Sequence, residues 1–376
     1  MKRSITPGQI KRNNRQLIYE YIYGHPRVSQ QDISYELKLS RPTVANNLAA
    51  LEEEGFIEKA GLKDSGTVGR KAMAFQINAQ KRIAIGVDHQ VDSLHLAAVD
   101  LNGELVKFLI DPLPFENTKE YYRAAATHIQ KFIDSVKNSD EQILGVGIAM
   151  QGLVSPDGTH TIYGKIVNFD GLTVDQFSQY LPYPCKLRHD AACGAISELW
   201  ENENLMNAMY LFVGWHLGAE IIYNRKLVHG KHGHPSSIEH LPLFSKKKKC
   251  YCGNYGCAET ECCLSAVIHE GEDIDEFFNH VRNNDPSYIE RWETFLRNMA
   301  IAINAAHLLV DVDYVLGGTI APYLTESDIQ FVQEEVAKLS PFDDSDDFIH
   351  ISRMPEHNIP IGAALPYLED YLDSLF

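Results

Sequence analysis

Apolar residues recur at helical spacing in the first forty residues. A first helix is indicated by four of them: Leu17, Ile18, Tyr21 and Ile22. A second helix is expected to begin after Ser29, because Asp32 three positions later completes a variant of the capping box. Its apolar side is formed by Ile33 and Leu37. Two short helices that pack on one core are therefore predicted near the N-terminus.

A third amphipathic helix is predicted over residues 41–54. Ser40 can cap its N-terminus, and Pro42 fits its first turn. Its apolar face comprises three residues: Val44, Leu48 and Leu51. Four polar residues are expected on the opposite face: Arg41, Thr43, Asn46 and Asn47. Such side chains can hydrogen-bond to base edges and phosphates in a major groove, so this helix is predicted to contact DNA.

A hairpin pattern follows the third helix. Residues 56–59 and 72–77 predict two strands, and the loop between them carries basic and glycine residues: Lys63, Gly66, Gly69, Arg70 and Lys71. Arg70 and Lys71 would form a basic tip. The order helix, helix, turn, helix, two-stranded wing predicts a winged helix-turn-helix domain over residues 1–80. A small helical domain for dimerisation or protein binding would explain the apolar positions equally well, but it gives the basic tip no role.

Charge is unevenly distributed along the 376 residues. The net charge is -17, yet residues 1–82 contain fourteen Lys and Arg against eight Asp and Glu. A basic head precedes an acidic body, which favours a head that binds phosphates and a body with another task. The composition, 44% apolar and 23% charged, is that of an ordinary globular protein. No apolar run is long enough to span a membrane and the residues after Met1 are polar, so a cytoplasmic protein without a membrane partner is expected.

After the head, the pattern becomes mixed α/β. One helix and three strands are predicted, over residues 121–136 and over residues 83–87, 94–99 and 143–149, respectively. Asn102-Gly103 supplies a tight hairpin turn. The order hairpin, helix, strand suggests one half of a two-lobed, nucleotidase-like fold. Periodicity alone does not specify that topology.

Five stretches, in this order along the chain, resemble the ROK family (repressors, open reading frames and kinases): residues 145–154, His189-Asp190, residues 230–240, residues 250–259 and Gly317-Gly318. With its winged head, the chain is similar to the family's transcriptional repressors. The resemblance implies a two-lobed actin-like ATPase (ribonuclease H-like) fold over residues 81–376, with a sugar in the cleft and a homodimer or dimer of dimers. Lobe one would span about 81–189 plus a C-terminal helix at about 362–376, and lobe two about 190–361 with a zinc loop.

Three of the seven cysteines fall within eight residues: Cys250, Cys252 and Cys257. Gly253 and Gly256 permit sharp turns between them, and His240 is the candidate fourth ligand. Three thiolates and one imidazole satisfy tetrahedral zinc without an open position, so a structural zinc site is predicted. The alternative, buried free cysteines, would not need this spacing. Cys262 and Cys263 need no function beyond filling space.

Three phosphate-handling features distinguish the kinases of this family, and two are altered here. Where the resemblance implies Asp followed by a Gly-Gly-Thr turn, residues 88–91 are Asp-His-Gln-Val. In the glycine-rich second turn, Trp215 and His216 add bulk and Glu220 adds negative charge. The third feature, Gly-Gly-Thr at 317–319, is retained. The chain is therefore predicted to be a repressor of carbohydrate-utilisation genes and no enzyme, with a sugar kinase carrying an auxiliary DNA-binding head as the alternative.

The resemblance also implies contacts to the effector, by an Asn-Asp pair, by the acid and imidazole of Gly-Glu-x-Gly-His, and by a Glu after the last zinc cysteine. The corresponding residues here are His189, Asp190, Ser237, His240 and Glu259. Asp190 matches the catalytic base of the kinases, and contact with a ligand hydroxyl is its favoured role here.

Three of these substitutions change the predicted ligand. Ser237 makes fewer hydrogen bonds than a carboxylate, His189 replaces an amide, and Arg188 stands where an acidic residue is common. If Arg188 faces the cleft, a phosphorylated or carboxylated sugar would be tolerated. Two alternatives stay open: a cleft that has lost ligand sensitivity, leaving a constitutive binder of operator DNA, and an ordinary sugar bound differently.

Overall fold

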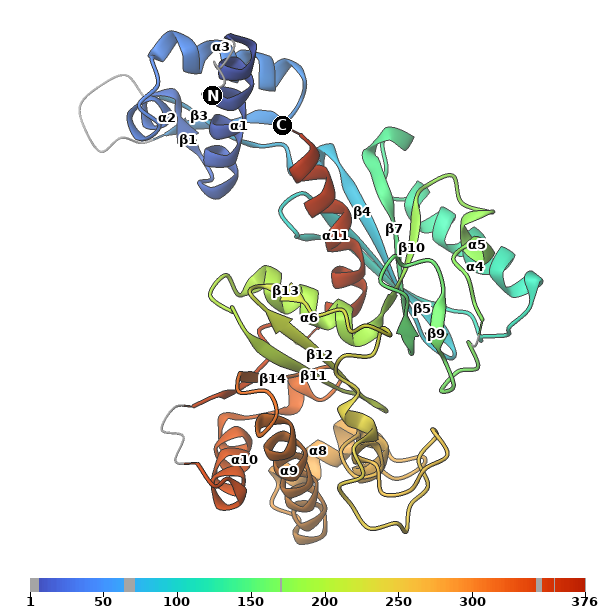
Figure 1. The fold of residues 1–376 in the computed structure, drawn as a ribbon. Helices are drawn as coiled ribbons and strands as arrows, with labels where there is room; N and C mark the ends of the chain where they lie inside the picture. Colours follow the sequence, from blue (N-terminus) through green and yellow to red (C-terminus); the bar gives the residue numbers. More distant parts are fainter. Residues whose placement is uncertain (1–6, 64–71, 170, 343–346, 355, 376) are drawn as a thin grey trace.

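The computed structural model describes residues 7–63, 72–169, 171–342, 347–354 and 356–375. Figure 1 shows a small N-terminal head and two α/β lobes, with the C-terminal helix running between the head and the lobes. Each of these three parts contains its own sheet. The predicted α/β organisation behind a winged head is confirmed. No helix of the described residues is long and apolar enough to cross a membrane.

The head contains three helices and a three-stranded antiparallel sheet. The helices are α1 (Pro7–Gly24), α2 (Gln30–Glu36) and α3 (Arg41–Glu53), and the sheet order is β1 (Val28–Ser29), β3 (Ala72–Ile77), β2 (Ile57–Lys63). The Ser29 side chain accepts from the backbone N–H of Asp32, whose carboxylate accepts from the Ser29 N–H, so the predicted capping box is confirmed. Ser40 accepts from the N–H of Thr43 over 3.2 Å and caps α3 as predicted.

Lobe one is a mixed five-stranded sheet. Its order is β10 (Cys185–His189), β7 (Ile143–Met150), β4 (Ile83–His89), β5 (Ser93–Asp100), β6 (Leu105–Pro112). Alternate residues of β4 bury opposite faces: Ile85 packs toward α4 (Lys119–Asp134), whereas Ala84 and Gly86 face the C-terminal helix. The smaller elements beside the sheet are β8 (Leu153–Val154), β9 (Thr161–Tyr163) and α5 (Asp175–Ser178).

Lobe two carries the second sheet and the long helices at the far end of the molecule (Figure 1). Its order is β13 (Lys226–Leu227), β12 (Leu217–Tyr223), β11 (Ala208–Val213), β14 (Asp313–Gly317), β15 (Ile349–Ile351). The helices are α7 (Leu264–Val267), α8 (Ile274–Arg282), α9 (Pro286–His307) and α10 (Glu326–Leu339). Their apolar faces and one face of the sheet share one buried core.

Two helices join the lobes: α6 (Asp190–Glu201), directly after β10, and α11 (Asn358–Ser374). The C-terminal helix thus begins earlier than predicted. It lies against β4 and β7, where a Cβ on Gly86 would be 1.6 Å from the carbonyl oxygen of Pro360. Only glycine permits this close approach. The first turn of α11 is also fixed to lobe two, because the side chain of Asn358 donates to the hydroxyl of Tyr210 over 2.9 Å.

The head is packed against the body. The Tyr23 hydroxyl donates to the carbonyl oxygen of Leu101 over 3.0 Å. Burial, together with the nearby charges of Asp100 and of Glu369 on α11, raises the pKa of this tyrosine. Apolar residues of the head, of β5 and of α11 form one continuous buried cluster. Figure 1 accordingly shows the C-terminus beside the head. The helix α11 thus packs on lobe one, bonds to lobe two and shares a buried cluster with the head.

Candidate DNA-binding face, ligand cleft and metal cluster

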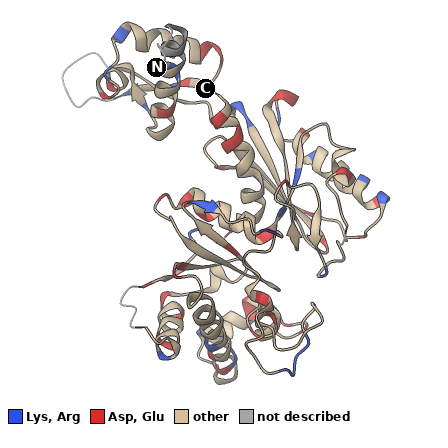
Figure 2. Ribbon diagram, in the orientation of Figure 1, with Lys and Arg blue, Asp and Glu red and all other residues tan. Residues whose placement is uncertain are grey.

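The predicted DNA-contacting helix is exposed on the side of the head away from the lobes (Figure 1). In α3, Arg41 and Asn46 are exposed and Thr43 is half-buried, whereas the apolar face is buried against α1 and α2. Figure 2 shows acidic residues on the end of α11 nearest the head. These carboxylates give that side of the head a negative charge, which would repel phosphates.

The side chain of Asn47 is not where the sequence predicts it to be. Its side chain is buried, with 7% exposed, and its Nδ2 donates to the carbonyl oxygen of Thr43 over 2.8 Å. The amide thus stabilises its own helix, and the expectation that it faces DNA is wrong. The predicted wing contacts Arg70 and Lys71 lie outside the described residues. Lys63, at the end of β2, forms an ion pair with Asp32 at 2.8 Å, which fixes the base of the wing to α2.

A cleft between the lobes contains a cavity of about 70 Å³. Its lining includes His189 and Asp190 where β10 meets α6, the turn between β11 and β12, and Gln151 and Tyr163 of lobe one. Pockets for small ligands usually have about 300 to 1,000 Å³. The cavity in the cleft is smaller than such pockets.

His189 lies between two carboxylates. Its Nδ1 is 2.9 Å from Oε1 of Glu220, and its Nε2 is 3.2 Å from Oδ1 of Asp190. Burial alone would lower the pKa of His189, but the hydrogen bond to Glu220 and the charge of Asp190 raise it to about 9. The ring is thus an imidazolium at neutral pH. Burial raises the pKa of Asp190, while the charge of His189 acts in the opposite direction.

Glu259, predicted to contact the effector, is occupied by the protein. Its Oε1 lies 2.6 Å from Nδ1 of His216, and its Oε2 accepts from the N–H of Leu217 over 2.8 Å. Neither Glu259 nor the predicted contacts Ser237 and His240 belong to the lining of the cavity. Contact of these three residues with an effector therefore stays a prediction.

Glu239 is the acidic residue that lines the cavity beside Asp190, and sequence reasoning missed it as a contact. It is buried, with 7% exposed, and burial raises its pKa to about 7. It stands at the glycine of the family segment, so the motif gave no sign of a contact. Its position next to His240, in the short turn Ile238–His240, was the one available signal.

The first phosphate turn of the family is filled by amide side chains. Gln90 donates from Nε2 to both carboxylate oxygens of Asp88 over 2.8 Å, and its Oε1 accepts from Gln151 over 2.7 Å. At the second turn, Trp215 is half-exposed and His216 is tied to Glu259. The retained third turn has Gly318 at a φ of 80°, a conformation that favours glycine.

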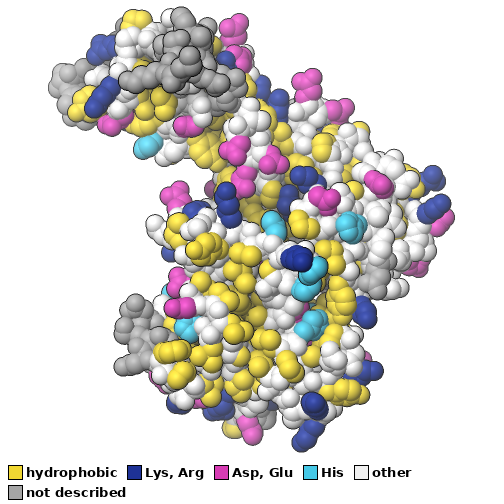
Figure 3. Space-filling view, viewed as in Figure 1, with side chains coloured by type: hydrophobic (Ala, Val, Ile, Leu, Met, Phe, Trp, Pro, Cys, Tyr) yellow, Lys and Arg dark blue, Asp and Glu magenta, His cyan; other side chains and the backbone are white. Residues whose placement is uncertain are grey.

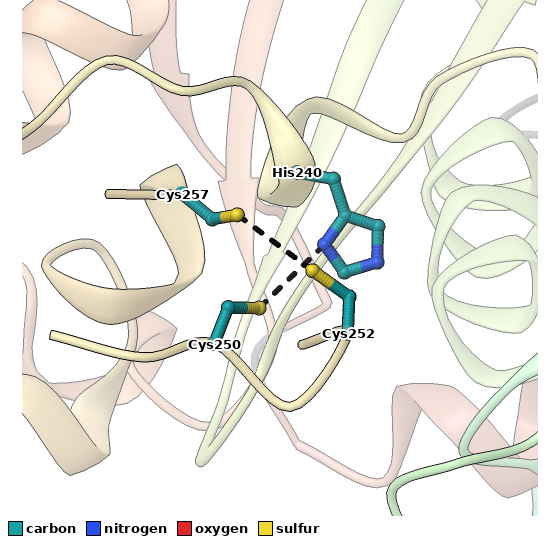
Figure 4. Close-up of side chains that lie close together, drawn as sticks. All are labelled: His240, Cys250, Cys252 and Cys257. Atoms are coloured by element: carbon teal, nitrogen blue, oxygen red, sulfur yellow. Dashed lines mark hydrogen bonds between the residues drawn. The ribbon is translucent and has the colours of Figure 1, made fainter. Parts of the chain in front are cut away.

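Four side chains converge on one point beside the cleft: His240, Cys250, Cys252 and Cys257 (Figure 4). Their ligand atoms all lie within 4.8 Å of one another. Nδ1 of His240 is 3.7 Å from Sγ of Cys250, and the sulfurs of Cys252 and Cys257 are 3.8 Å apart. A tetrahedral zinc with bonds of about 2.3 Å to sulfur and about 2.0 Å to nitrogen separates its ligand atoms by about 3.5 to 3.8 Å. The cluster therefore fits such an ion, and the predicted set of four residues is brought together.

Two family models match the chain. The model described as "ROK family" matches residues 84–340, and the one described as "Winged helix-turn-helix DNA-binding" matches residues 11–58. Among curated proteins, the chain is 27% identical over 267 residues to the xylose repressor of Caldicellulosiruptor bescii, covering 69% of this chain and 66% of that protein. It is 24% identical to the DNA-binding transcriptional dual regulator NagC of Escherichia coli, covering 69% of this chain and 64% of that protein. The match thus spans slightly less than two thirds of both relatives.

Solved structures show the same architecture. A ROK family transcriptional regulator, a homologue of the E. coli MLC protein, superposes with a TM-score of 0.71 at 20% identity, covering 96% of this chain and 98% of that chain. A ROK family glucokinase from Streptomyces griseus, in complex with glucose and AMPPNP, superposes with a TM-score of 0.68 at 16% identity, covering 76% of this chain and 98% of that chain. At these identities the likeness shows the fold alone, the two-lobed actin-like fold expected from the sequence.

Proposed function

This chain belongs to the ROK family, and from that premise we propose that it is a transcriptional regulator that represses carbohydrate-utilisation genes and responds to a sugar or sugar derivative. The observation that carries the proposal is the exposed outer face of a capped α3 on a winged head that packs against the body. Relatives named as xylose repressor and as the regulator NagC support this assignment. The sheets support a domain boundary near residue 80 and lobes that meet at α6.

Binding of operator DNA would use α3 and the wing. Arg41, Thr43 and Asn46 are the proposed contacts from α3, and Arg70 and Lys71 those from the wing tip. A homodimer would place two α3 helices about 34 Å apart, one turn of DNA, on a palindromic operator. Asn47 is left out of this set because it bonds to its own helix.

The effector would act by separating the lobes. A ring that enters the small cleft must displace the contact between His189 of lobe one and Glu220 of lobe two. The resulting shift of lobe two would move α11, which bonds to Tyr210 at one end and shares a buried cluster with the head at the other. A coupling of about 1 to 3 kcal/mol changes operator affinity about 5- to 150-fold. His189 and Asp190 remain the proposed effector contacts, joined by Glu239.

Sugar phosphorylation is not the proposed activity. Asp190 is paired with the His189 imidazolium, which would have to be removed before the carboxylate could accept a hydroxyl proton. Gln90 fills the first phosphate turn, and Trp215 and His216 crowd the second. A kinase assignment would rest on the retained Asp190 and the Gly-Gly-Thr turn at 317–319, and neither supplies a place for the phosphates.

The His/Cys cluster is proposed to hold a structural zinc ion. His240, Cys250, Cys252 and Cys257 would supply all four positions, so no position stays open for substrate. When bound, the ion neutralises the thiolates and fixes the loop over residues 240–257. That loop continues into Glu259, which orders the turn at His216 and Leu217. The site would therefore shape the cleft without touching the ligand.

A mobility-shift assay with the full-length protein and DNA from upstream of its own gene tests the proposal. We expect a retarded band that weakens when Arg41 is changed to Ala, and whose intensity responds to at least one sugar in a panel. Lys38→Ala, an exposed change just outside α3, is the matched control and should bind normally. Failure to retard any upstream fragment would contradict the proposal, whereas DNA binding that no sugar alters would limit the protein to constitutive repression.

A further inference from the structure

A second hollow, of about 110 Å³, lies next to the cleft. It is bounded by the loop over residues 153–158, by β10, by α6 and by residues 227–235. Leu153 and His189 line both spaces, so His189 stands between them. The hollow has room for several water molecules, the size of a small ionic group.

Two cations of β10 line this hollow without a partner. Lys186 and Arg188 are two residues apart on the strand, so both side chains leave the same face of the sheet. Among the residues that the structure describes, neither side chain makes a hydrogen bond or an ion pair. The Nε of Arg188 is buried and unsatisfied. An unsatisfied buried donor is unfavourable, and this cost is removed when an acceptor enters.

The acidic groups around the hollow are already engaged. Glu220 is paired with His189 at 2.9 Å, and Asp157 accepts from Ser155 and Thr159 within its own turn. Glu369 of α11 is close enough to Arg188 for its charge to act, but it forms no ion pair with it among the described contacts. The first two carboxylates keep their negative charge, but neither forms an ion pair with Lys186 or Arg188 in the described part of the chain, so these two cations remain available to an anion.

The opposite wall adds an imidazole side chain. His229, which follows β13, lines the hollow, and the rings of His232 and His234 stack 6.1 Å apart on the same loop. Figure 3 shows Lys, Arg and His side chains gathered near the junction of the lobes. A guanidinium next to an ammonium is the donor set that proteins use for phosphate and carboxylate groups.

We propose that this hollow binds the anionic group, phosphate or carboxylate, of an acidic sugar whose ring lies in the cleft between the lobes. The inference rests on the proposed sugar response and specifies its chemical class. Arg188 would bind the anion through its fork of N–H donors, and Lys186 would add a point charge at the open side. Arg188 thus reaches the ligand from the hollow, not from the cleft, where its side chain does not lie.

Isothermal titration calorimetry of the full-length protein with glucose, glucose 6-phosphate and glucuronate tests this. We expect at least one acidic sugar to bind on the order of 10-fold more tightly than glucose, and the phosphate and carboxylate arms show which group fits. Arg188→Gln should lower the affinity for that acidic sugar about 10-fold and leave the affinity for glucose unchanged. Lys186 is exposed, so Lys186→Gln will fold even if Arg188→Gln does not, and it should lower the same affinity by a smaller factor.

Lys226→Gln is the matched control, because Lys226 is exposed in lobe two and does not line the hollow. It should leave all three affinities unchanged. Glucose binding as tightly as both acidic sugars, no binding of either acidic sugar, or full affinity in both β10 variants would overturn the inference. Calorimetry is done without DNA, so its result is independent of the mobility-shift assay. A negative mobility-shift assay would contradict the proposed DNA-binding regulator. A negative calorimetry result would contradict only the proposed acidic ligand.

Discussion

His189 and Glu220 connect the two lobes, since His189 ends β10 of lobe one and Glu220 lies in β12 of lobe two. Nδ1 of the imidazole is 2.9 Å from Oε1 of the carboxylate, and both side chains are largely buried. Lobe opening must break this contact and expose both charges. The strength of the closed arrangement therefore depends on whether His189 is protonated.

We expect the free energy of unfolding to fall as the pH rises from about 6.5 toward 9. The pKa of His189 is raised from 6.5 to about 9 in the folded protein. A group with a raised pKa stabilises the fold fully below its unfolded value and loses that contribution as the pH rises through the folded value. The interval corresponds to about 3 kcal/mol. Chemical denaturation at a series of pH values measures it.

Glu220→Gln removes the main partner that raises this pKa. The variant should be less stable than the wild type near neutral pH, and its stability should vary less over the same interval. Glu203→Gln, an exposed acid after α6, is the control and should keep the wild-type slope. Equal slopes for the wild type and Glu220→Gln would show that the contact does not set the protonation of His189.

Adjacent asparagines of α3 should behave differently. Asn46→Ala is expected to change the sequence preference of DNA binding, at about 1 to 3 kcal/mol for the affected base pair, with little effect on stability. Asn47→Ala should instead cost about 1 kcal/mol of stability, because the bond to Thr43 is lost, and leave the preference unchanged. Binding to a randomised DNA library, together with thermal unfolding, separates the two. A change of preference in Asn47→Ala alone would reverse the assignment.

Features that depend only on residues close together in the sequence could be predicted from it. The caps at Ser29 and Ser40 involve residues three positions apart, and the alternation in β4 follows from the pleat. The burial of Asn47 is predictable as well, because at about 100° per residue its side chain lies about 40° from Leu51, beside the apolar face. A polar side chain can occupy such a buried position when it hydrogen-bonds to its own helix, as Asn47 does.

The cleft could not be predicted in this way. Glu259 is fixed by His216, 43 positions away, and His189 by Glu220, 31 positions away. Which acid meets which histidine depends on how two sheets dock, and no local periodicity encodes that. Family motifs supplied the positions of Asp190 and the metal ligands, but they gave no sign of Glu239, because the acid of the segment stands two positions later than in the family pattern.

The wing tip should contribute charge without sequence preference. Replacing Arg70 and Lys71 together by Gln is expected to weaken binding to all DNA sequences about equally. Each lost phosphate contact should reduce the slope of log affinity against log salt by about 0.9, so the double variant should lose nearly 2. Fluorescence anisotropy over a salt series gives the slope. Lys38→Gln on the turn before α3 is the control, and an unchanged slope in the double variant would exclude the wing from the interface.

Removing the contact between His189 and Asp190 should not produce kinase activity. We expect no ATP consumption by the wild type with any sugar of a panel, and none by His189→Asn, which restores the family amide and frees Asp190. Gln90 would still occupy the first phosphate turn, and Trp215 and His216 the second. A coupled assay for ADP, with a sugar kinase as positive control, measures this. Sugar-dependent ADP release by the wild type would contradict the proposal that the regulator has no kinase activity, and it would support the kinase alternative.

Loss of the metal should loosen the cleft as well as the loop that binds it. We expect one zinc per chain by elemental analysis, and Cys252→Ser should lose it and about 2 kcal/mol or more of stability. Cys252 is the half-buried member of the cluster, so its replacement creates no large cavity. Cys185→Ser, in lobe one and outside the cluster, should keep its zinc.

Because the loop leads into Glu259, the turn at His216 should become more accessible to hydrogen exchange in the zinc-free protein, while the head should exchange as before. Full zinc content in Cys252→Ser, or exchange that rises equally in the head, would contradict this account.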